Sequence, residues 1–240
     1  MLKKNLFNKI YPKLIYLFLI LFLLNLNNII SNLTISGGNA PIADWGNYSR
    51  GGGIYLFHSD PILTHVTISG NEGGGLYLSA SNPTLTHVTI SWNDGAQSGG
   101  MGLYYSNPIL TNVLISGNTA NSVLGAGGMY LLESNPTLNH VTISGNTSEY
   151  GSGAGGGFVL WNSAPTLINS IIWGNGSQWL YLVHDGLPNI TYSDIEDGWE
   201  GAGNLDVDPL FTDPENGDFT LLNSSQCIDA GDPDLDGDGE

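Results

Sequence analysis

The sequence predicts an all-β protein, a parallel β-helix (solenoid) of about six to seven coils. A block of fifteen residues recurs five times at constant length, with a Pro eight positions after its starting Gly and an Ile seven positions further on. The spacings between successive Ile residues, from Ile35 onward, are 33, 22, 25, 28 and 29, so all variation lies between the Ile and the next Gly. A constant block with one variable loop is typical of stacked repeats. The starting residues are Gly53, Gly75, Gly100, Gly128 and Gly157.

Each block begins with a short strand. Its third position is always Leu, and the second position, which alternates with it, is Tyr in three copies. This alternation predicts that Leu points inward and Tyr outward. A turn such as Ser-Asn-Pro (81–83) follows, because Pro cannot donate to a strand ladder. The inward residues are Leu56, Leu78, Leu103, Leu131 and Leu160.

The second strand carries Leu at position ten, Val at thirteen in four copies, and Ile at fifteen. The odd step from ten to thirteen predicts a bend in the chain, at His65, His87, Asn112, His140 and Asn169. The histidines could suggest a metal site, but Asn replaces His in two copies, so we expect a stacked turn ladder. After each Ile-Ser pair the block ends at an Asn whose amide is expected to stack, as in cross-β assemblies. These residues are Asn71, Asn93, Asn118, Asn146 and Asn175.

Stacking is required because a 22-residue coil cannot bury its apolar face alone. Coils about 4.8 Å apart can hydrogen-bond to each other along their whole length. Leucine-rich repeats and propeller blades do not fit so short a period.

The two ends differ from the repeats, which span residues 29–195. Residues 1–28 combine a Lys-rich start with the apolar run LIYLFLILFLL (14–24), which predicts a signal peptide or an N-terminal anchor helix. The alternative is a buried helix that caps the solenoid. Residues 196–240 are expected to form an irregular acidic C-terminal module that is incomplete.

The charge balance limits the partners. The chain has 22 acidic and 5 basic side chains, and beyond residue 13 the only Lys or Arg is Arg50. Nucleic acid is excluded as a partner because nothing could neutralise its phosphates. Cations, neutral glycans or a basic protein surface are compatible. A membrane would be reached only through the N-terminal hydrophobic segment.

The segments GGGIY (51–55), NPTL (82–85) and VTISGN (141–146) resemble right-handed parallel β-helix repeats of the pectate-lyase-like superfamily. They are also similar to repeats of polymorphic outer-membrane proteins. The segments 189–195, 203–211 and 227–233 resemble the choice-of-anchor-type C-terminal module of secreted bacterial β-helix proteins. The resemblance implies a right-handed solenoid that is secreted or at the cell surface or outer membrane. It does not imply an activity, because the architecture carries lyases, hydrolases and adhesins.

A lyase of the pectate type, as the resemblance implies, needs a Lys or Arg base, which argues against that activity here. A glycoside hydrolase needs two carboxylates about 5 to 9.5 Å apart. Glu72 and Asp94 are the candidate catalytic pair, since each follows a ladder Asn on consecutive coils. They could instead be solvated turn residues or calcium ligands.

Calcium is the one candidate cofactor. Carboxylates alternate before a Gly in DPDLDGDGE (232–240), which matches the start of a calcium-binding loop. A solvated acidic tail is the alternative. The candidate ligands are Asp232, Asp234, Asp236 and Asp238.

Outward aromatic rings that stack between coils suit sugar rings, although they also suit ordinary sheet packing. The candidate ligand-binding residues are Tyr55, Tyr77, Tyr130 and Trp161. The sequence therefore favours a secreted or cell-surface non-enzymatic β-helix that binds a polysaccharide or another surface component through its face and variable loops. The alternatives are a carbohydrate-active enzyme and a structural spacer or anchor module.

Overall fold

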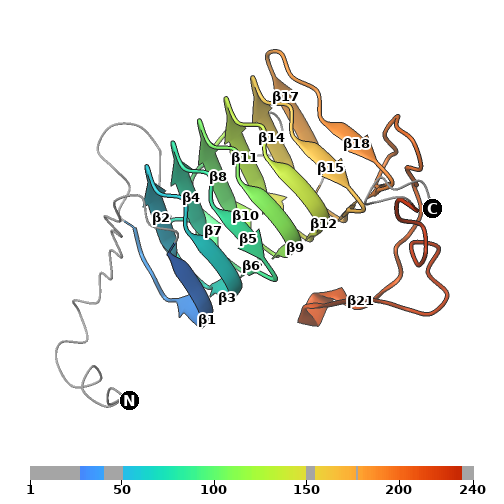
Figure 1. Ribbon diagram of the computed structural model, residues 1–240, viewed down its shortest axis with the longest axis horizontal. Helices are drawn as coiled ribbons and strands as arrows, with labels where there is room; N and C mark the ends of the chain where they lie inside the picture. The colour runs from blue at the N-terminus through green and yellow to red at the C-terminus, as the bar shows by residue number, and fades with distance from the viewer. Residues whose placement is uncertain (1–27, 41–50, 150–154, 177, 234–240) are drawn as a thin grey trace.

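The protein is an all-β parallel solenoid, as predicted (Figure 1). The computed structural model describes residues 28–40, 51–149, 155–176 and 178–233. The predicted signal or anchor helix lies almost wholly outside these residues. Within them, no helix is long and apolar enough to cross a membrane.

Three sides build each coil, and strands of successive coils pair in parallel on every side. The first side contains β1 (Ile29–Ser36), β3 (Ile62–Ser69), β5 (Thr84–Thr86), β6 (Thr89–Ser91), β9 (Ile109–Ser116), β12 (Thr137–Ser144), β15 (Thr166–Ile168), β16 (Ile171–Trp173), β18 (Asn189–Thr191) and β19 (Asp194–Ile195). The second contains β2 (Ile54–Phe57), β4 (Leu76–Ser79), β8 (Met101–Tyr104), β11 (Met129–Leu132), β14 (Phe158–Trp161) and β17 (Leu180–Val183). The third contains β7 (Asp94–Gly95), β10 (Thr119–Ala120) and β13 (Thr147–Ser148).

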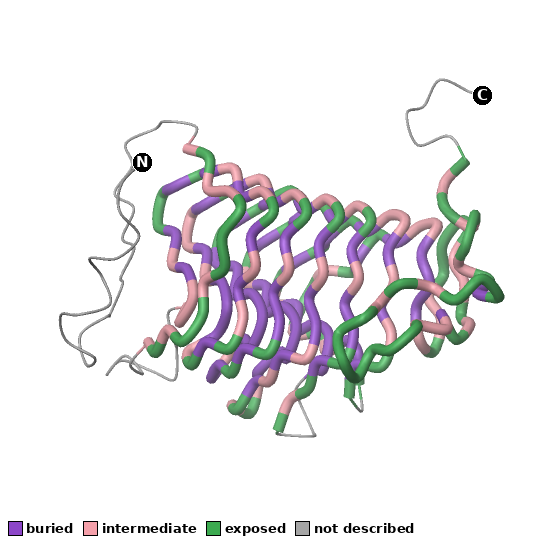
Figure 2. The backbone as a smooth tube through the Cα atoms, turned by 90° about the horizontal axis from the view of Figure 1, so that it is seen from below, coloured by how far each residue is buried: buried purple, intermediate pink, exposed green. Residues whose placement is uncertain are grey.

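Like residues lie over like, as the repeat alignment predicts. Leu78 pairs with Leu103 on the second side, and Ile68 pairs with Ile90 on the first. All four are fully buried, and Figure 2 shows buried residues recurring from coil to coil. The interior is therefore an aliphatic stack that removes most of the apolar side-chain area from water.

The solenoid has about five turns, slightly fewer than the six to seven predicted. On the third side, pairs and single bridges link five coils, at Asn39, Glu72, Asp94, Thr119 and Thr147. The first side extends beyond these five coils at its C-terminal end, where β15, β16, β18 and β19 follow. The repeat count in the sequence follows the first side, which explains the difference.

The predicted Asn ladder is confirmed. Each of Asn71, Asn93, Asn118 and Asn146 donates its side-chain amide to the side-chain oxygen of the next coil's Asn, over 2.8 to 2.9 Å. The same oxygen accepts the backbone N–H of the preceding ladder Asn at 3.0 to 3.2 Å. A second ladder of Ser hydroxyls, which the sequence analysis did not identify, runs from Ser59 to Ser163.

The predicted bend on the first side is also present. His65, His87 and the equivalent residues of the other coils have left-handed backbone conformations, with φ from 52° to 54° in five coils. The rings of His65 and His87 stack with centroids 4.9 Å apart. Asn and His tolerate this conformation better than bulkier side chains, which explains why they alternate at this position.

The described part of the C-terminal module leaves the last coil and folds back along the solenoid (Figure 1). We call residues 206–233 the C-terminal arm. It contains an antiparallel hairpin of β20 (Phe211–Asp213) and β21 (Asp218–Leu221), joined by the 3-10 helix η1 (Pro214–Asn216). Figure 2 shows that most of the arm is exposed.

Candidate ligand-binding groove

The predicted aromatic residues lie on the outer face of the second side. The ring centroids of Tyr55 and Tyr77 are 5.4 Å apart, and Tyr104 continues the stack at 4.6 Å from Tyr77. Tyr130 lies 5.7 Å beyond Tyr104 but is only 3% exposed. Trp161 is half-buried, with its ring edge-on to His184. Only the Tyr55 end of this stack therefore offers ring surface to a ligand.

The variable loops cover the middle of this face. Tyr104 and Tyr130 belong to a second hydrophobic cluster with Ala126 and Val159, outside the main core. Tyr104 also donates its hydroxyl hydrogen bond to Gln97. The described loop residues Gln97 and Ala126 therefore pack against the outer face of the sheet at Tyr104 and Tyr130.

The predicted carboxylate pair lies on the third side. Glu72 and Asp94 form a parallel bridge between neighbouring coils, and both are exposed. Asn39 donates to the Glu72 carboxylate at 2.5 Å, and Asn121 donates to Asp94 at 2.9 Å. Partial burial raises the pKa of Asp94 above its ordinary value, and the nearby carboxylates of Glu149 and Glu72 raise it further.

Of the predicted calcium ligands, only Asp232 lies in the described residues, and Asp234, Asp236 and Asp238 lie outside them. The backbone N–H of Asp232 donates to the Asn169 side chain at 2.7 Å. Among the described residues no group of three or more His, Cys, Asp or Glu side chains could hold a metal ion.

A groove that the sequence analysis did not predict lies between one corner of the solenoid and the C-terminal arm. Its volume is about 540 Å³. We call it the aromatic groove. The solenoid residues that line it are Trp92, Ser116, Gly117, Ser144, Gly145, Trp173 and Gly174. The arm residues are Asp208, Leu210, Phe211, Pro214, Glu215, Phe219 and Leu222.

Glycines form the floor of the aromatic groove. Gly117, Gly145 and Gly174 turn the corner of three successive coils, with φ of 62°, 66° and 68°. This left-handed conformation favours Gly. An added Cβ would meet no clash at Gly145 and Gly174, where the nearest atoms are 3.8 Å away at ordinary van der Waals contact. The missing side chains leave an open channel along the corner.

Trp92 stands at the same corner, where neighbouring coils have Gly70 and Gly117. Its φ of 55° is left-handed, and its side chain is 59% exposed. The ring lies over Gly117, because a Cβ built there would be only 3.0 Å from a ring carbon. A bulky side chain in this conformation costs about 1–2 kcal/mol relative to the ordinary helical region. Because the Trp92 side chain is mostly exposed, the burial of its ring offsets little of that cost.

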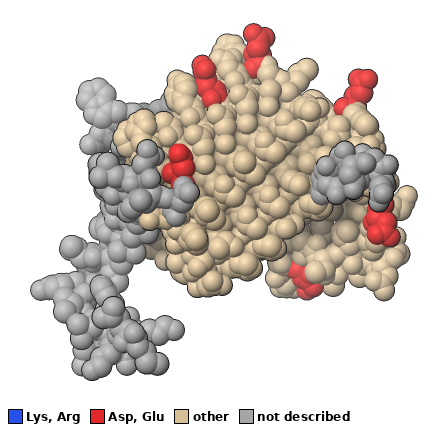
Figure 3. All heavy atoms as spheres, viewed as in Figure 1, with Lys and Arg blue, Asp and Glu red and all other residues tan. Residues whose placement is uncertain are grey.

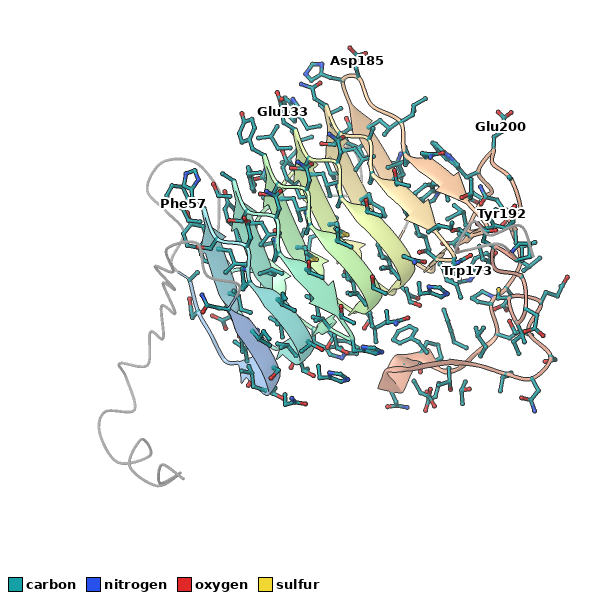
Figure 4. The ribbon with its side chains drawn as sticks, in the orientation of Figure 1. Phe57, Glu133, Trp173, Asp185, Tyr192 and Glu200 are labelled. Atoms are coloured by element: carbon teal, nitrogen blue, oxygen red, sulfur yellow. The ribbon has the colours of Figure 1, made fainter. Side chains whose placement is uncertain are left out.

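The arm supplies the opposite wall. The rings of Phe211 and Phe219 meet edge to face, with centroids 5.1 Å apart. The exposed carboxylates of Asp208 and Glu215 also line the groove. In Figure 4, the labelled Trp173 lies at the edge of the solenoid near the arm, and side chains of the hairpin project into the space between them.

A buried carboxylate anchors the arm to the last coil. Asp194 is 3% exposed and accepts hydrogen bonds from the Val207 backbone at 3.1 Å and from the Cys227 thiol at 3.3 Å. Burial raises the pKa of Asp194 above its ordinary value. Burial, together with the hydrogen bond to Asp194, raises the pKa of Cys227 to about 11, so the thiol stays protonated.

The fold and this groove define an all-β parallel solenoid with an aromatic channel beneath a C-terminal arm. No family model, curated protein or solved structure matches the chain. The sequence carries one signal for the groove: Trp92 interrupts the Ile-Ser-Gly-Asn repeat at the position where other coils have Gly. The arm residues carried no such signal, because nothing in the repeat shows where the tail folds.

Proposed function

We propose that this protein is a secreted or cell-surface solenoid that binds a glycan in the aromatic groove without turning it over. The observation that carries the proposal is Trp92, an exposed ring on a left-handed backbone where neighbouring coils have Gly. Residues held in costly backbone conformations cluster at functional sites.

The chemistry of the groove suits sugar rings. Pyranose rings present C–H faces that pack on aromatic rings, and their hydroxyls need hydrogen-bond acceptors around the edge. Trp92 and Trp173 supply rings, and Asp208 and Glu215 supply acceptors.

The test is binding of the full chain to a panel of soluble oligosaccharides and insoluble polysaccharides, comparing the wild type with Trp92→Gly. This change removes the ring and installs the residue that neighbouring coils use. We expect affinity to fall about tenfold, which corresponds to about 1.4 kcal/mol. Far-UV circular dichroism should stay unchanged.

Tyr105→Gly is the matched control. Tyr105 is also an exposed aromatic residue with a left-handed backbone, at φ 52°, but it does not line the groove. Its removal should leave binding unchanged. Equal losses in both variants would contradict the proposed site. A wild type that binds no glycan would instead support the structural spacer.

The second candidate function is a carbohydrate-active enzyme that uses Glu72 and Asp94. Their bridge on consecutive coils and the raised pKa of Asp94 favour it, because a general acid must hold its proton. The test is release of reducing ends from the same panel. Turnover that disappears in the Glu72→Ala/Asp94→Ala double variant would establish the enzyme.

Three parts of the proposal rest on the sequence alone. The pattern of residues 1–28 supports export, and the repeat motifs support a relationship to pectate-lyase-like and polymorphic outer-membrane β-helices. The alternating carboxylates at 232–238 support calcium binding. Calorimetric titration of the full chain with calcium tests the last point, and absence of heat would refute it.

A further inference from the structure

The charges around the aromatic groove have one sign. Asp208 and Glu215 are its only ionisable lining residues, and the described residues contain no Lys or Arg. Figure 3 shows acidic side chains and no basic ones among the described residues of that view. A uronic-acid or sulfated glycan would meet repulsion along the whole channel, whereas a cationic ligand would be attracted.

The two tryptophans set the length of the ligand. Ser91, the residue before Trp92, pairs with Ser116 on the next coil, Ser116 pairs with Ser144, and Ser144 pairs with Trp173. Trp92 and Trp173 therefore belong to coils three steps apart. At the strand spacing of a β-sheet the backbones of these two residues lie about 14 Å apart along the solenoid axis. The Trp92 ring extends over Gly117 of the next coil, toward Trp173. The groove therefore suits an oligomer, with a ring at each end and the arm carboxylates alongside.

From these observations we propose that the aromatic groove binds an amino-sugar polymer with free ammonium groups, a glucosamine oligosaccharide. This inference rests on the proposed function and narrows it. The pyranose faces would pack on Trp92 and Trp173, and the ammonium groups would pair with Asp208 and Glu215. A basic peptide is disfavoured because the floor consists of glycine corners, which offer no open strand edge for an added strand.

The test compares the full chain's affinity for β-1,4-linked glucosamine oligomers with that for N-acetylglucosamine oligomers of equal length, by calorimetry, at a pH where the amine is protonated. We expect the glucosamine oligomer to bind about fivefold more tightly, the order that two solvent-exposed ion pairs can supply. The preference should shrink at high salt because exposed charges are screened.

The double variant Asp208→Asn/Glu215→Gln should abolish the preference, so that both oligomers bind with equal affinity, because the amide oxygens can still accept hydrogen bonds from sugar hydroxyls but carry no charge. The charge-matched control is Glu133→Gln/Glu200→Gln, which removes two exposed carboxylates away from the groove (Figure 4). This control should keep the preference. If both double variants lose the preference equally, the net charge of the protein and not the groove carboxylates causes it. That result would overturn the inference.

Other outcomes separate this inference from the proposed function. Equal affinity for both oligomers, with both lost in Trp92→Gly, would refute the amino-sugar preference and leave glycan binding intact. Binding of neither oligomer nor any other glycan would refute both. A Lys-rich peptide that competes more strongly than the glucosamine oligomer would assign the groove to peptides and overturn the inference.

Discussion

The Asn ladder offers a sharp test of how the solenoid is held together. Asn118 lies at its centre and is fully buried. Its side-chain amide donates to the Ile90 carbonyl and to Asn146, each at 2.9 Å. Its side-chain oxygen accepts from the backbone and the side chain of Asn93 at 3.0 and 2.9 Å. Replacement by Ala removes all four hydrogen bonds.

The expected cost follows from the backbone groups that lose this partner. In Asn118→Ala, the Asn93 N–H and the Ile90 carbonyl each lose the Asn118 side chain as a hydrogen-bond partner, in an interior that excludes water. At about 1–3 kcal/mol for each buried unsatisfied group, the free energy of unfolding should fall by about 2–6 kcal/mol. This is a large share of the stability of an ordinary domain.

The matched control is Asn107→Ala in the exposed turn row. The Asn107 side-chain oxygen accepts from the Asn135 backbone at 2.6 Å, but the residue is exposed. Water can replace this hydrogen bond, so we expect a loss below about 1 kcal/mol.

Urea unfolding followed by circular dichroism and by Trp fluorescence measures both variants. The two probes should be compared because stacked repeats can unfold in parts. If Asn118→Ala costs no more than Asn107→Ala, the ladder does not stabilise the fold, and the reasoning from buried hydrogen bonds is wrong.

Three further predictions concern the core, the arm and the groove. Leu103→Ala should lower the unfolding free energy by about 2–5 kcal/mol in the same urea assay, since Leu103 is fully buried and its removal leaves a cavity; a loss below 1 kcal/mol would contradict the core assignment. Burial raises the pKa of Asp194 above 3.8, so its contribution to stability is full below pH 3.8 and is lost as pH rises through the raised pKa. In Asp194→Asn, the fall in stability with rising pH should be smaller, as measured by urea midpoints across pH. An unchanged pH profile would refute the role of Asp194 in this fall. Trp92→Gly should raise the unfolding free energy by up to about 1–2 kcal/mol, because Gly adopts the left-handed conformation without strain; a clear loss would show that the ring supports the fold.

The repeating part of the fold could be predicted from the sequence because it depends on local periodicity. The fixed distances from Gly to Pro to Ile place like residues in register, so the inward Leu, the buried Asn and the bend at His65 all follow from one copy. Each coil is surrounded by near-copies of itself. The residues that surround each coil can therefore be identified from the neighbouring repeats in the sequence.

The non-repeating contacts could not be predicted in this way. Tyr130 has an outward position in the strand pattern, yet a folded-back loop around Ala126 covers it. Counting places Glu72 and Asp94 on adjacent coils, but the raised pKa of Asp94 depends first on its partial burial and then on Glu149, in a loop further along the chain. Loop paths follow no period, so their contacts must be seen in space.

By itself, the sequence determined the parallel solenoid, its aliphatic interior and its ladders, because hydrogen bonding between equal coils leaves only one register for equal side chains. Only the tertiary structure decided where the tail goes. The arm is tied to the solenoid by hydrogen bonds to the buried Asp194 carboxylate and to the Asn169 side chain. These contacts join residues 13 to 63 positions apart and follow no repeat, and the aromatic groove exists only because the arm lies against the solenoid.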